Sequence, residues 1–186
     1  MMKVHMMRHI KNTNNRRREY MKKKWIAICS VVLLCLSTTV VYGSTTNYVL
    51  QNWDLVDSGK HLDWDGKTNY MTEWYNAVNT WNAYKPGVIR ADRWDIIQDV
   101  AISDKATKDG ATFATTYAIG KIVFYQDTMD KMTSTQRQAT ITHEIGHALG
   151  LDHNKKETSI MRQGYKNFVN LDEIDKAGYD AAYLKY

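Results

Sequence analysis

Three histidines and one glutamate in a short stretch of the chain have the types and spacing of a metal-dependent hydrolytic site. The stretch starts at His143 and reads His-Glu-Ile-Gly-His-Ala-Leu-Gly-Leu-Asp-His. His143 and His147 are four residues apart, so on a helix both imidazoles project from one face and can bind one metal ion. Glu144 is then placed to accept a proton from a metal-bound water without being a ligand itself.

A glycine near the end of this stretch brings in a third histidine. Gly150 can take a positive φ, which ends a helix and turns the chain, so that His153 returns as a third ligand. Three neutral imidazoles and one open position describe a catalytic zinc site, whereas a structural site would have four protein ligands. Nitrogen-only ligation suits zinc, although copper, nickel or cobalt can occupy such a site in vitro.

The helix that carries the first two histidines has the strongest local signals in the chain. Thr133 and Gln136 have the spacing of a capping box, in which each side chain bonds the backbone of the other residue. The segment runs to Leu149, and Gly150 is its natural stop. We therefore predict a helix from Thr133 to Leu149.

Two more helices are predicted, one before and one after this one. The first spans about 70–84, where apolar residues recur at helical spacing and Asn69 is the expected cap. The second spans about 171–184, with Asn170 and Glu173 as the expected capping pair.

Short strands are expected between the first two helices. The segment 112–118 alternates in polarity, whereas Lys-Ile-Val-Phe-Tyr-Gln at 121–126 is apolar on both faces and is typical of a buried strand. The two-residue link Ile119-Gly120 predicts that these two strands form a hairpin. The predicted strands are Val88–Arg90, Asp99–Ser103, Thr112–Ala118 and Lys121–Gln126.

The histidine motif resembles that of the metzincin clan of zinc metallopeptidases, whose signature is H-E-x-x-H-x-x-G-x-x-H followed by a Met-turn. Within the clan, the wording His-Ala-Leu-Gly-Leu-Asp-His looks most like the matrixins. The resemblance implies that His143, His147 and His153 bind zinc and that Glu144 is the general base. The sequence Ser-Ile-Met matches the Met-turn, which implies that Met161 lies beneath the zinc.

The same resemblance predicts the fold. It implies an α+β, zincin-like metalloprotease domain over residues 61–186, after a short segment at 44–60. Such a domain has an N-terminal helix, an active-site helix, a C-terminal helix and a mixed twisted sheet with an antiparallel edge strand. Thr112–Ala118 is the candidate edge strand, against which a peptide or protein substrate would lie extended.

The chain departs from matrixins around the specificity pocket and in the means of latency. After the Met-turn comes Arg-Gln-Gly-Tyr instead of a tyrosine-proline pair, so the pocket formed by 162–169 is not transferable. Tyr165 can stabilise an oxyanion or be a wall of that pocket. No cysteine follows residue 43 to block the zinc, so a carboxylate such as Asp54 or Asp57 is a hypothesis for the latent state.

Further metal ions have less support. A structural zinc needs several more histidines, and only His61 is available, so one catalytic ion is expected. Calcium can bind at Asp63 and Asp65 or at Asp127 and Asp130, but such acids are more often solvated turn residues.

The first 43 residues have the pattern of an export signal. Three lysines precede the apolar run Trp25–Leu36, and a cut after Gly43 would follow small or medium residues. This pattern predicts a cleaved signal peptide over 1–43 and a secreted protein. Residues 1–20 are long for such a leader, and we interpret them as an over-extended start. The alternative is an uncleaved membrane anchor over 25–42, although Ser and Thr interrupt its second half.

The charge balance argues against a nucleic-acid partner. The 186 residues contain 25 Lys+Arg and 20 Asp+Glu, a net charge of +5. Nine of the basic residues and one acid lie in 1–43, so residues 44–186 carry a net charge of −3. Their basic residues are scattered, so a phosphate-binding patch is unsupported. Both cysteines, Cys29 and Cys35, lie in the leader as well.

These observations predict a secreted, monomeric, zinc-dependent metalloendopeptidase that meets the membrane only through its export signal. Three alternatives stay open: the same protease anchored by residues 25–42, an inactive zinc-binding relative that acts as a binding module, and a zinc hydrolase of non-peptide bonds. The presence of Glu144 argues against the inactive relative, since a silent site has no need of that carboxylate.

Overall fold

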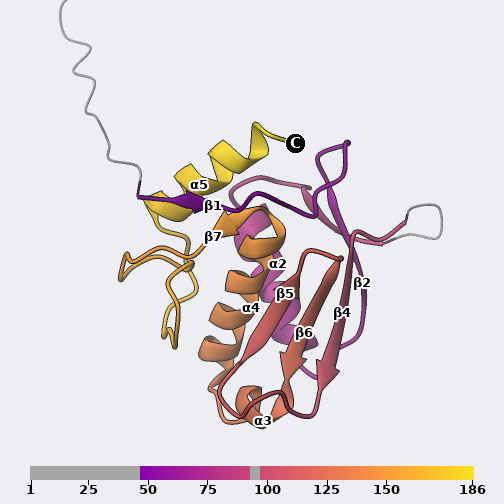
Figure 1. The fold of residues 1–186 in the computed structure, drawn as a ribbon, viewed down its shortest axis with the longest axis vertical. Helices are drawn as coiled ribbons and strands as arrows, with labels where there is room; N and C mark the ends of the chain where they lie inside the picture. The colour runs from indigo at the N-terminus through magenta and orange to yellow at the C-terminus, as the bar shows by residue number, and fades with distance from the viewer. Residues whose placement is uncertain (1–46, 93–96) are drawn as a thin grey trace, which may run out of the picture. The chain divides into compact units, whose positions relative to one another are not determined.

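The computed structural model describes residues 47–92 and 97–186, whose helices and strands are shown in Figure 1. The leader predicted over 1–43 lies outside the described residues. The strands are β1 (Val49–Leu50), β2 (Leu62–Gly66), β3 (Ile89–Ala91), β4 (Val100–Lys105), β5 (Ala114–Tyr117), β6 (Lys121–Tyr125) and β7 (Leu151–Asp152). The helices are α2 (Met71–Asn82), α3 (Gln126–Met129), α4 (Ser134–Ala148) and α5 (Glu173–Tyr183).

Five of the strands form one mixed sheet in the order β3-β2-β4-β6-β5. β2 is parallel to both β3 and β4, and β4 is parallel to β6. β5 lies at the edge and is antiparallel to β6 (Figure 1). The predicted mixed sheet with an antiparallel edge strand is therefore confirmed, and the predicted edge segment 112–118 contains β5.

The link between β5 and β6 is one residue longer than predicted. Tyr117 pairs with Lys121, so the turn contains Ala118, Ile119 and Gly120. Gly120 has a φ of 78°, and a Cβ at this position would lie 2.6 Å from the carbonyl oxygen of Asp99. Because the backbone at Asp99, just before β4, approaches this closely, position 120 requires glycine.

β2 is a strand that the sequence does not predict. Asp63 was expected to be a solvated turn residue or a calcium ligand, but it lies in β2 and is fully buried. Arg90 of the adjacent β3 donates from Nε and Nη2 to the two carboxylate oxygens of Asp63, at 2.9 and 2.6 Å. A buried carboxylate needs such a paired partner, and only the register of β2 with β3 supplies it. Asp65, in the same strand, is exposed.

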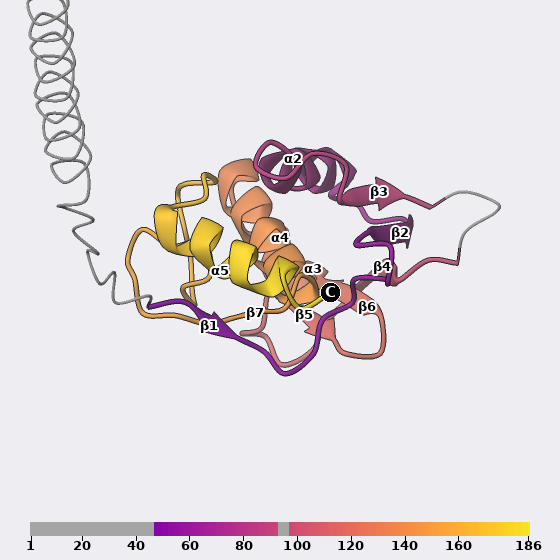
Figure 2. The same cartoon turned by 90° about the horizontal axis from the view of Figure 1, so that it is seen from above.

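The helix α2 packs against both the sheet and α4. The ring of Trp74 packs edge-on against Phe124 of β6, with 6.2 Å between the centroids. Further along α2, the indole nitrogen of Trp81 donates to the carbonyl oxygen of Thr142 in α4, at 2.9 Å. Figure 2 shows α2 and α4 packed side by side. The aromatic residues at helical spacing are therefore core residues, as their spacing predicts.

The caps of α2 and α5 differ from those predicted. Tyr70, not Asn69, is the cap residue of α2, and its side chain makes no capping bond. Asn69 lies one residue before the cap, where its backbone N–H donates to the carboxylate of Asp104. The capping pair of α5 is Asp172 with Asp175, two residues later than predicted. For α4 the predicted capping box of Thr133 and Gln136 is confirmed.

The polar segment before residue 60 lies beside the histidine motif. β1 pairs antiparallel with β7, with Leu50 opposite Leu151 and Val49 opposite Asp152. The backbone N–H of Gln51 also donates to the carbonyl oxygen of Gly150, at 2.9 Å. Among the described residues, no helix is both long and apolar enough to span a bilayer.

Candidate metal centre

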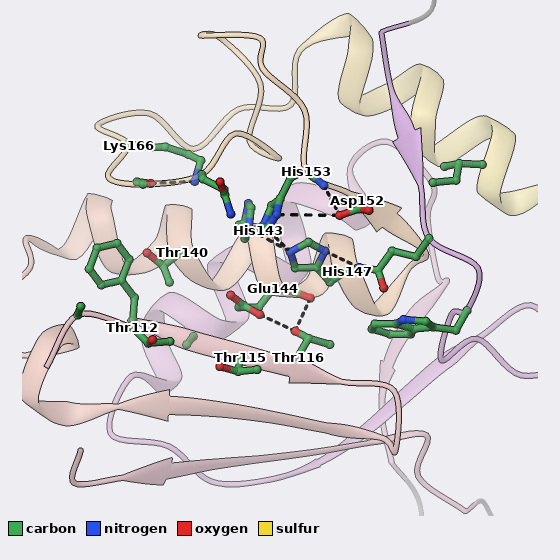
Figure 3. Close-up of a pocket in the computed structure, with 18 of the residues that line it drawn as sticks. Thr112, Thr115, Thr116, Thr140, His143, Glu144, His147, Asp152, His153 and Lys166 are labelled. Carbon is green, nitrogen blue, oxygen red and sulfur yellow. Dashed lines mark hydrogen bonds and ion pairs between the residues drawn. The ribbon is translucent and has the colours of Figure 1, made fainter. Parts of the chain in front are cut away.

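Three imidazoles meet at one point beside α4. His143 and His147 lie on the same face of α4 and are buried, and Gly150, with a φ of 86°, turns the chain so that His153 faces them. The three Nε2 atoms form a triangle with all sides 3.1 Å long. Figure 3 shows the three rings converging above the edge strand. The turn at Gly150 therefore assembles the group that the sequence predicts.

This triangle fits a single zinc ion. Three nitrogens bound to zinc at about 2.0–2.1 Å in tetrahedral geometry lie roughly 3.3 Å apart. The spacing of 3.1 Å is close to this value, and all three imidazoles line the cavity. The donor set, three imidazole nitrogens without a thiolate, is that of a catalytic rather than a structural site.

Backbone carbonyls fix the orientation of two of the rings. Nδ1 of His143 lies 2.8 Å from the carbonyl oxygen of Ile160, and Nδ1 of His147 lies 2.8 Å from that of Leu151. When each Nδ1–H donates to its carbonyl, the lone pair of Nε2 is free for a metal. The Nε2 atom of Gln51 donates to the same Leu151 carbonyl at 3.1 Å and lies 2.7 Å from Nδ1 of His147. Gln51 thus ties the N-terminal segment to the carbonyl that orients this ring.

Burial keeps the imidazoles neutral. Desolvation lowers the pKa of His143 well below its ordinary value of 6.5, and the proximity of His147 adds to the effect. Desolvation is also the largest cause of the lowered pKa of His147 and of His153. Neutral imidazole is the form that binds a metal, so the site is ready for one at neutral pH.

Glu144 lies in the same cavity, with its carboxylate facing the edge strand. The hydroxyl of Thr116 in β5 lies 2.7 Å from Oε2 and 2.9 Å from the backbone carbonyl oxygen of Glu144 (Figure 3). Burial raises the pKa of Glu144, and the bond from Thr116 opposes this rise. A buried carboxylate with a raised pKa is a stronger base than a solvated one, which suits proton transfer.

Met161 lies under α4, in the part of the chain that the resemblance identifies as the Met-turn. Its side chain is fully buried against Gly146, at which a Cβ would overlap the Met161 sulfur. The carboxylate of Asp175 in α5 accepts from the N–H of Ile160 at 2.8 Å and from the hydroxyl of Ser159. Hydrogen bonds to Asp175 of α5 therefore hold the Met-turn in place, and the carbonyl of Ile160 in this turn orients His143.

The histidines and Glu144 open into a cavity of about 730 Å³. Its walls are α4, the edge strand, the N-terminal segment and the segment after the Met-turn. Residues outside the histidine motif also line it, among them Gln51, Trp53, Thr112, Phe113, Thr116, Thr140, Gln163, Gly164 and Lys166. The side chain of Lys166 is buried within this wall. Burial, reinforced by the charge of Arg162, lowers the pKa of the Lys166 ammonium to about 8.

Three of the predicted candidates lie elsewhere. Tyr165 is more than half exposed, and its ring packs on Phe113 rather than lining the cavity. Asp54 accepts a bond from the backbone of Val56, and Asp57 accepts one from the backbone of His61. The lining of the cavity contains Leu50, Gln51, Asn52 and Trp53 from this segment but neither of the two carboxylates.

The second pair of candidate calcium ligands has protein partners. Asp127 accepts a bond from the hydroxyl of Thr107 at 2.5 Å, and Asp130 accepts one from the hydroxyl of Tyr70 at 2.7 Å. These bonds attach the loop before the edge strand and the start of α2 to the α3 region. They give both carboxylates a structural role, while the buried Oδ1 of Asp127 has no hydrogen-bond partner among the described residues.

Gln51, Thr116 and Lys166 are site residues that the sequence does not identify. Gln51 and Thr116 reach the site through long-range contacts, to Leu151 and Glu144, so no local spacing marks them. Thr116 carries a partial signal, because alternation places it on the face of the predicted edge strand opposite Phe113 and Tyr117. Gln51 carries none, whereas Lys166 falls within 162–169, the segment that the resemblance implies for the specificity pocket.

Comparison with known proteins agrees with this geometry. The family model described as Matrixin matches residues 60–184, more than half of the chain. Matrix metalloproteinase-B of Caenorhabditis elegans is 50% identical over 42 residues, which cover 20% of this chain and 8% of that protein.

Proposed function

Because the chain belongs to the matrixin family of zinc metalloproteases, we propose that it is a zinc-dependent endopeptidase that hydrolyses peptide bonds in peptides or proteins. One observation carries the proposal: three Nε2 atoms 3.1 Å apart stand beside a buried carboxylate in an open cavity. His143, His147 and His153 are the proposed zinc ligands, and Glu144 is the proposed general base.

Bound zinc supplies a Lewis acid that polarises a carbonyl oxygen and lowers the pKa of water in the site. Glu144 then takes the proton from the attacking water and delivers it to the leaving amine. Its burial supports this role, because desolvation favours the protonated form that exists between the two transfers. Thr116 holds Oε2 at 2.7 Å and so leaves Oε1 free to exchange the proton.

The edge strand β5 offers a means to position the substrate. It pairs with β6 on one side only, and Thr112–Thr116 line the cavity on the other. A peptide in extended form can pair with the free edge through its backbone, which aligns one peptide bond with the histidines. Backbone pairing is independent of sequence, so selectivity must come from side-chain contacts in the cavity.

We propose further that the protein is secreted, with residues 1–43 as a cleaved signal peptide. The support is the sequence pattern of the leader alone. Intact-mass analysis of the protein recovered from the medium and from the membrane fraction tests it, since a membrane-bound chain that keeps residues 25–42 would indicate the membrane-anchored alternative.

Two substitutions test the assignment of the site. In Glu144→Ala we expect peptide cleavage to fall by a factor of at least about 100, because general-base catalysis is lost, while one zinc stays bound. In His147→Ala we expect the zinc content to fall, because a ligand is lost. His61→Ala is the matched control, since His61 lies outside the motif. Cleavage at the wild-type rate by Glu144→Ala, or full zinc content in His147→Ala, contradicts the assignment.

A generic peptide substrate with and without a chelator separates this function from the alternatives. An inactive binding module would bind zinc and cleave nothing. A hydrolase of non-peptide bonds would also leave every peptide intact, so chelator-sensitive cleavage of peptides excludes both.

A further inference from the structure

Lys166 is a buried cation in the wall of the active-site cavity. Its side chain is 5% exposed, and it lines the same cavity as His143 and Glu144. Its ammonium donates to the carbonyl oxygen of Gly164, two residues earlier, at 3.1 Å. Among the described residues, no carboxylate lies within ion-pair distance of this ammonium.

This arrangement leaves a charge without full compensation. An ammonium has three donors, and a single backbone carbonyl satisfies one of them. Burying a charge is costly unless it is paired and hydrogen-bonded. The nearby carboxylates of Glu144 and Asp175 act on the ammonium only from a distance, and Arg162 opposes them. The remaining donors therefore favour a group that enters the cavity with oxygen acceptors and negative charge.

A second donor lies in the same part of the cavity. Figure 3 shows Lys166, Thr140 and Thr112 on one side of the three histidines, with Asp152 on the other. The hydroxyl of Thr140 has only a weak partner, the sulfur of Met132 at 3.8 Å, so it can donate to a ligand. The hydroxyl of Thr112 donates to Asp109 and can accept. This end of the cavity suits a carboxylate, which accepts several bonds at once.

We propose that Lys166 is a specificity-determining residue, which selects peptide substrates that place an acidic side chain between the edge strand and the segment after the Met-turn. The proposal rests on the proposed peptidase function. It adds the substrate class, peptides with glutamate or aspartate next to the cleaved bond. A carboxylate in this position would accept from the Lys166 ammonium and from the hydroxyl of Thr140.

The test compares peptides that differ at one position. The zinc-loaded full chain is first given a peptide mixture to map the cleaved bond, and each position beside that bond is then occupied by Glu, Gln, Leu or Lys. At one position we expect kcat/KM for Glu to exceed that for Gln by about 10- to 100-fold, the effect of a charge-assisted hydrogen bond. Equal kcat/KM for Glu and Gln at every position overturns the proposal.

Three variants assign the preference to Lys166. In Lys166→Met we expect the Glu-to-Gln ratio to fall to near 1, and in Lys166→Glu we expect Lys to become the preferred residue. In Lys166→Arg, which keeps the charge, the ratio should persist, so the proposal stays testable if Lys166→Met fails to fold. Lys131→Met, at an exposed position outside the cavity wall, is the control for loss of one positive charge.

The possible outcomes separate this inference from the function on which it rests. If the wild-type chain cleaves no peptide, the proposed function fails. If it cleaves peptides and Lys166→Met lowers kcat/KM equally for all four residues, Lys166 stabilises the reaction itself, and the selectivity proposal is overturned.

Discussion

The contact between Gly146 and Met161 predicts that one added methyl group disturbs the site from within the core. Gly146 lies in α4 between the two helical histidines, and both Met161 and Trp81 are fully buried against it. A Cβ at position 146 would overlap the sulfur of Met161 and lie 3.1 Å from Cζ2 of Trp81. In Gly146→Ala the Met161 side chain must therefore move.

The expected magnitude follows from two opposing effects. Alanine in a helix interior is favoured over glycine by about 0.8–1.0 kcal/mol. Overpacking a core costs typically about 1–3 kcal/mol, and the overlap with the buried Met161 sulfur, together with the tight contact with the buried Trp81, places this site in the upper part of that range. We expect Gly146→Ala to lower the free energy of unfolding by about 1–2 kcal/mol, which corresponds to roughly 2–8 °C in Tm.

Urea unfolding of the chelator-treated protein, followed by tryptophan fluorescence, measures this effect without metal binding. Gly178→Ala is the matched control. It is also a helical glycine, but its Cβ would lie no closer than 3.2 Å to a neighbour, the Cβ of Tyr48. We expect Gly178→Ala to be more stable than Gly146→Ala by about 1 kcal/mol or more.

A double-mutant cycle decides whether the overlap is the cause. Met161→Ala alone should cost about 2–5 kcal/mol through the cavity that it leaves. In the double variant the new methyl group has space, so the total loss should be smaller than the sum by at least about 1 kcal/mol. Additive losses, or a Gly146→Ala variant as stable as the wild type, would refute the reasoning.

Three other predictions concern residues around the site. Thr116→Val removes the bond to the Glu144 carboxylate, so the pKa of Glu144 should rise further and the acid limb of the pH–rate profile should move to higher pH. An unchanged acid limb contradicts this prediction, and Thr115→Val is the control. Gln51→Ala should weaken zinc binding in a chelator competition by about 10- to 100-fold, and unchanged affinity would exclude a supporting role. The pKa of Glu73 is lowered, because bonds from its own backbone, Arg137 and Ser134 outweigh the effect of burial. The ionised Glu73 therefore stabilises the folded state above the ordinary pKa of 4.5, and this contribution is lost as the pH falls further. Glu73→Gln should therefore show a smaller fall in urea midpoint than the wild type between pH 6 and pH 3, and equal falls would contradict it.

The histidine motif and its helix could be predicted because their signals are local. Helical spacing puts His143 and His147 on one face, the capping box marks the start at Thr133, and Gly150 supplies the turn. Each of these depends on backbone geometry over a few residues, which amino-acid type controls directly. The antiparallel edge strand could be predicted for the same reason, together with the resemblance to matrixins.

The errors in the predicted fold fall where distant segments compete with local preference. Asp63 has the character of a turn residue, but β3 places Arg90 beside it, and the pair makes a buried strand possible. Asn69 is a favoured cap, but its backbone N–H donates to Asp104 of β4, and the helix is capped one residue later, at Tyr70. Arg90 and Asp104 are both distant in sequence from the residues that they bind, so neither contact could be predicted from the sequence.

The sequence by itself determined the group of three histidines and the carboxylate beside it, because spacing along a helix and the turn at Gly150 are enough to specify them. Only the tertiary structure decided what surrounds that group. Gln51, Thr116 and Lys166 come from three different segments, and the packing of β1 on β7 and of the edge strand beside α4 brings them into one cavity. The burial of a side chain depends on how the whole chain closes around it, and that is why the sequence places Lys166 in the pocket segment without showing that its charge is buried.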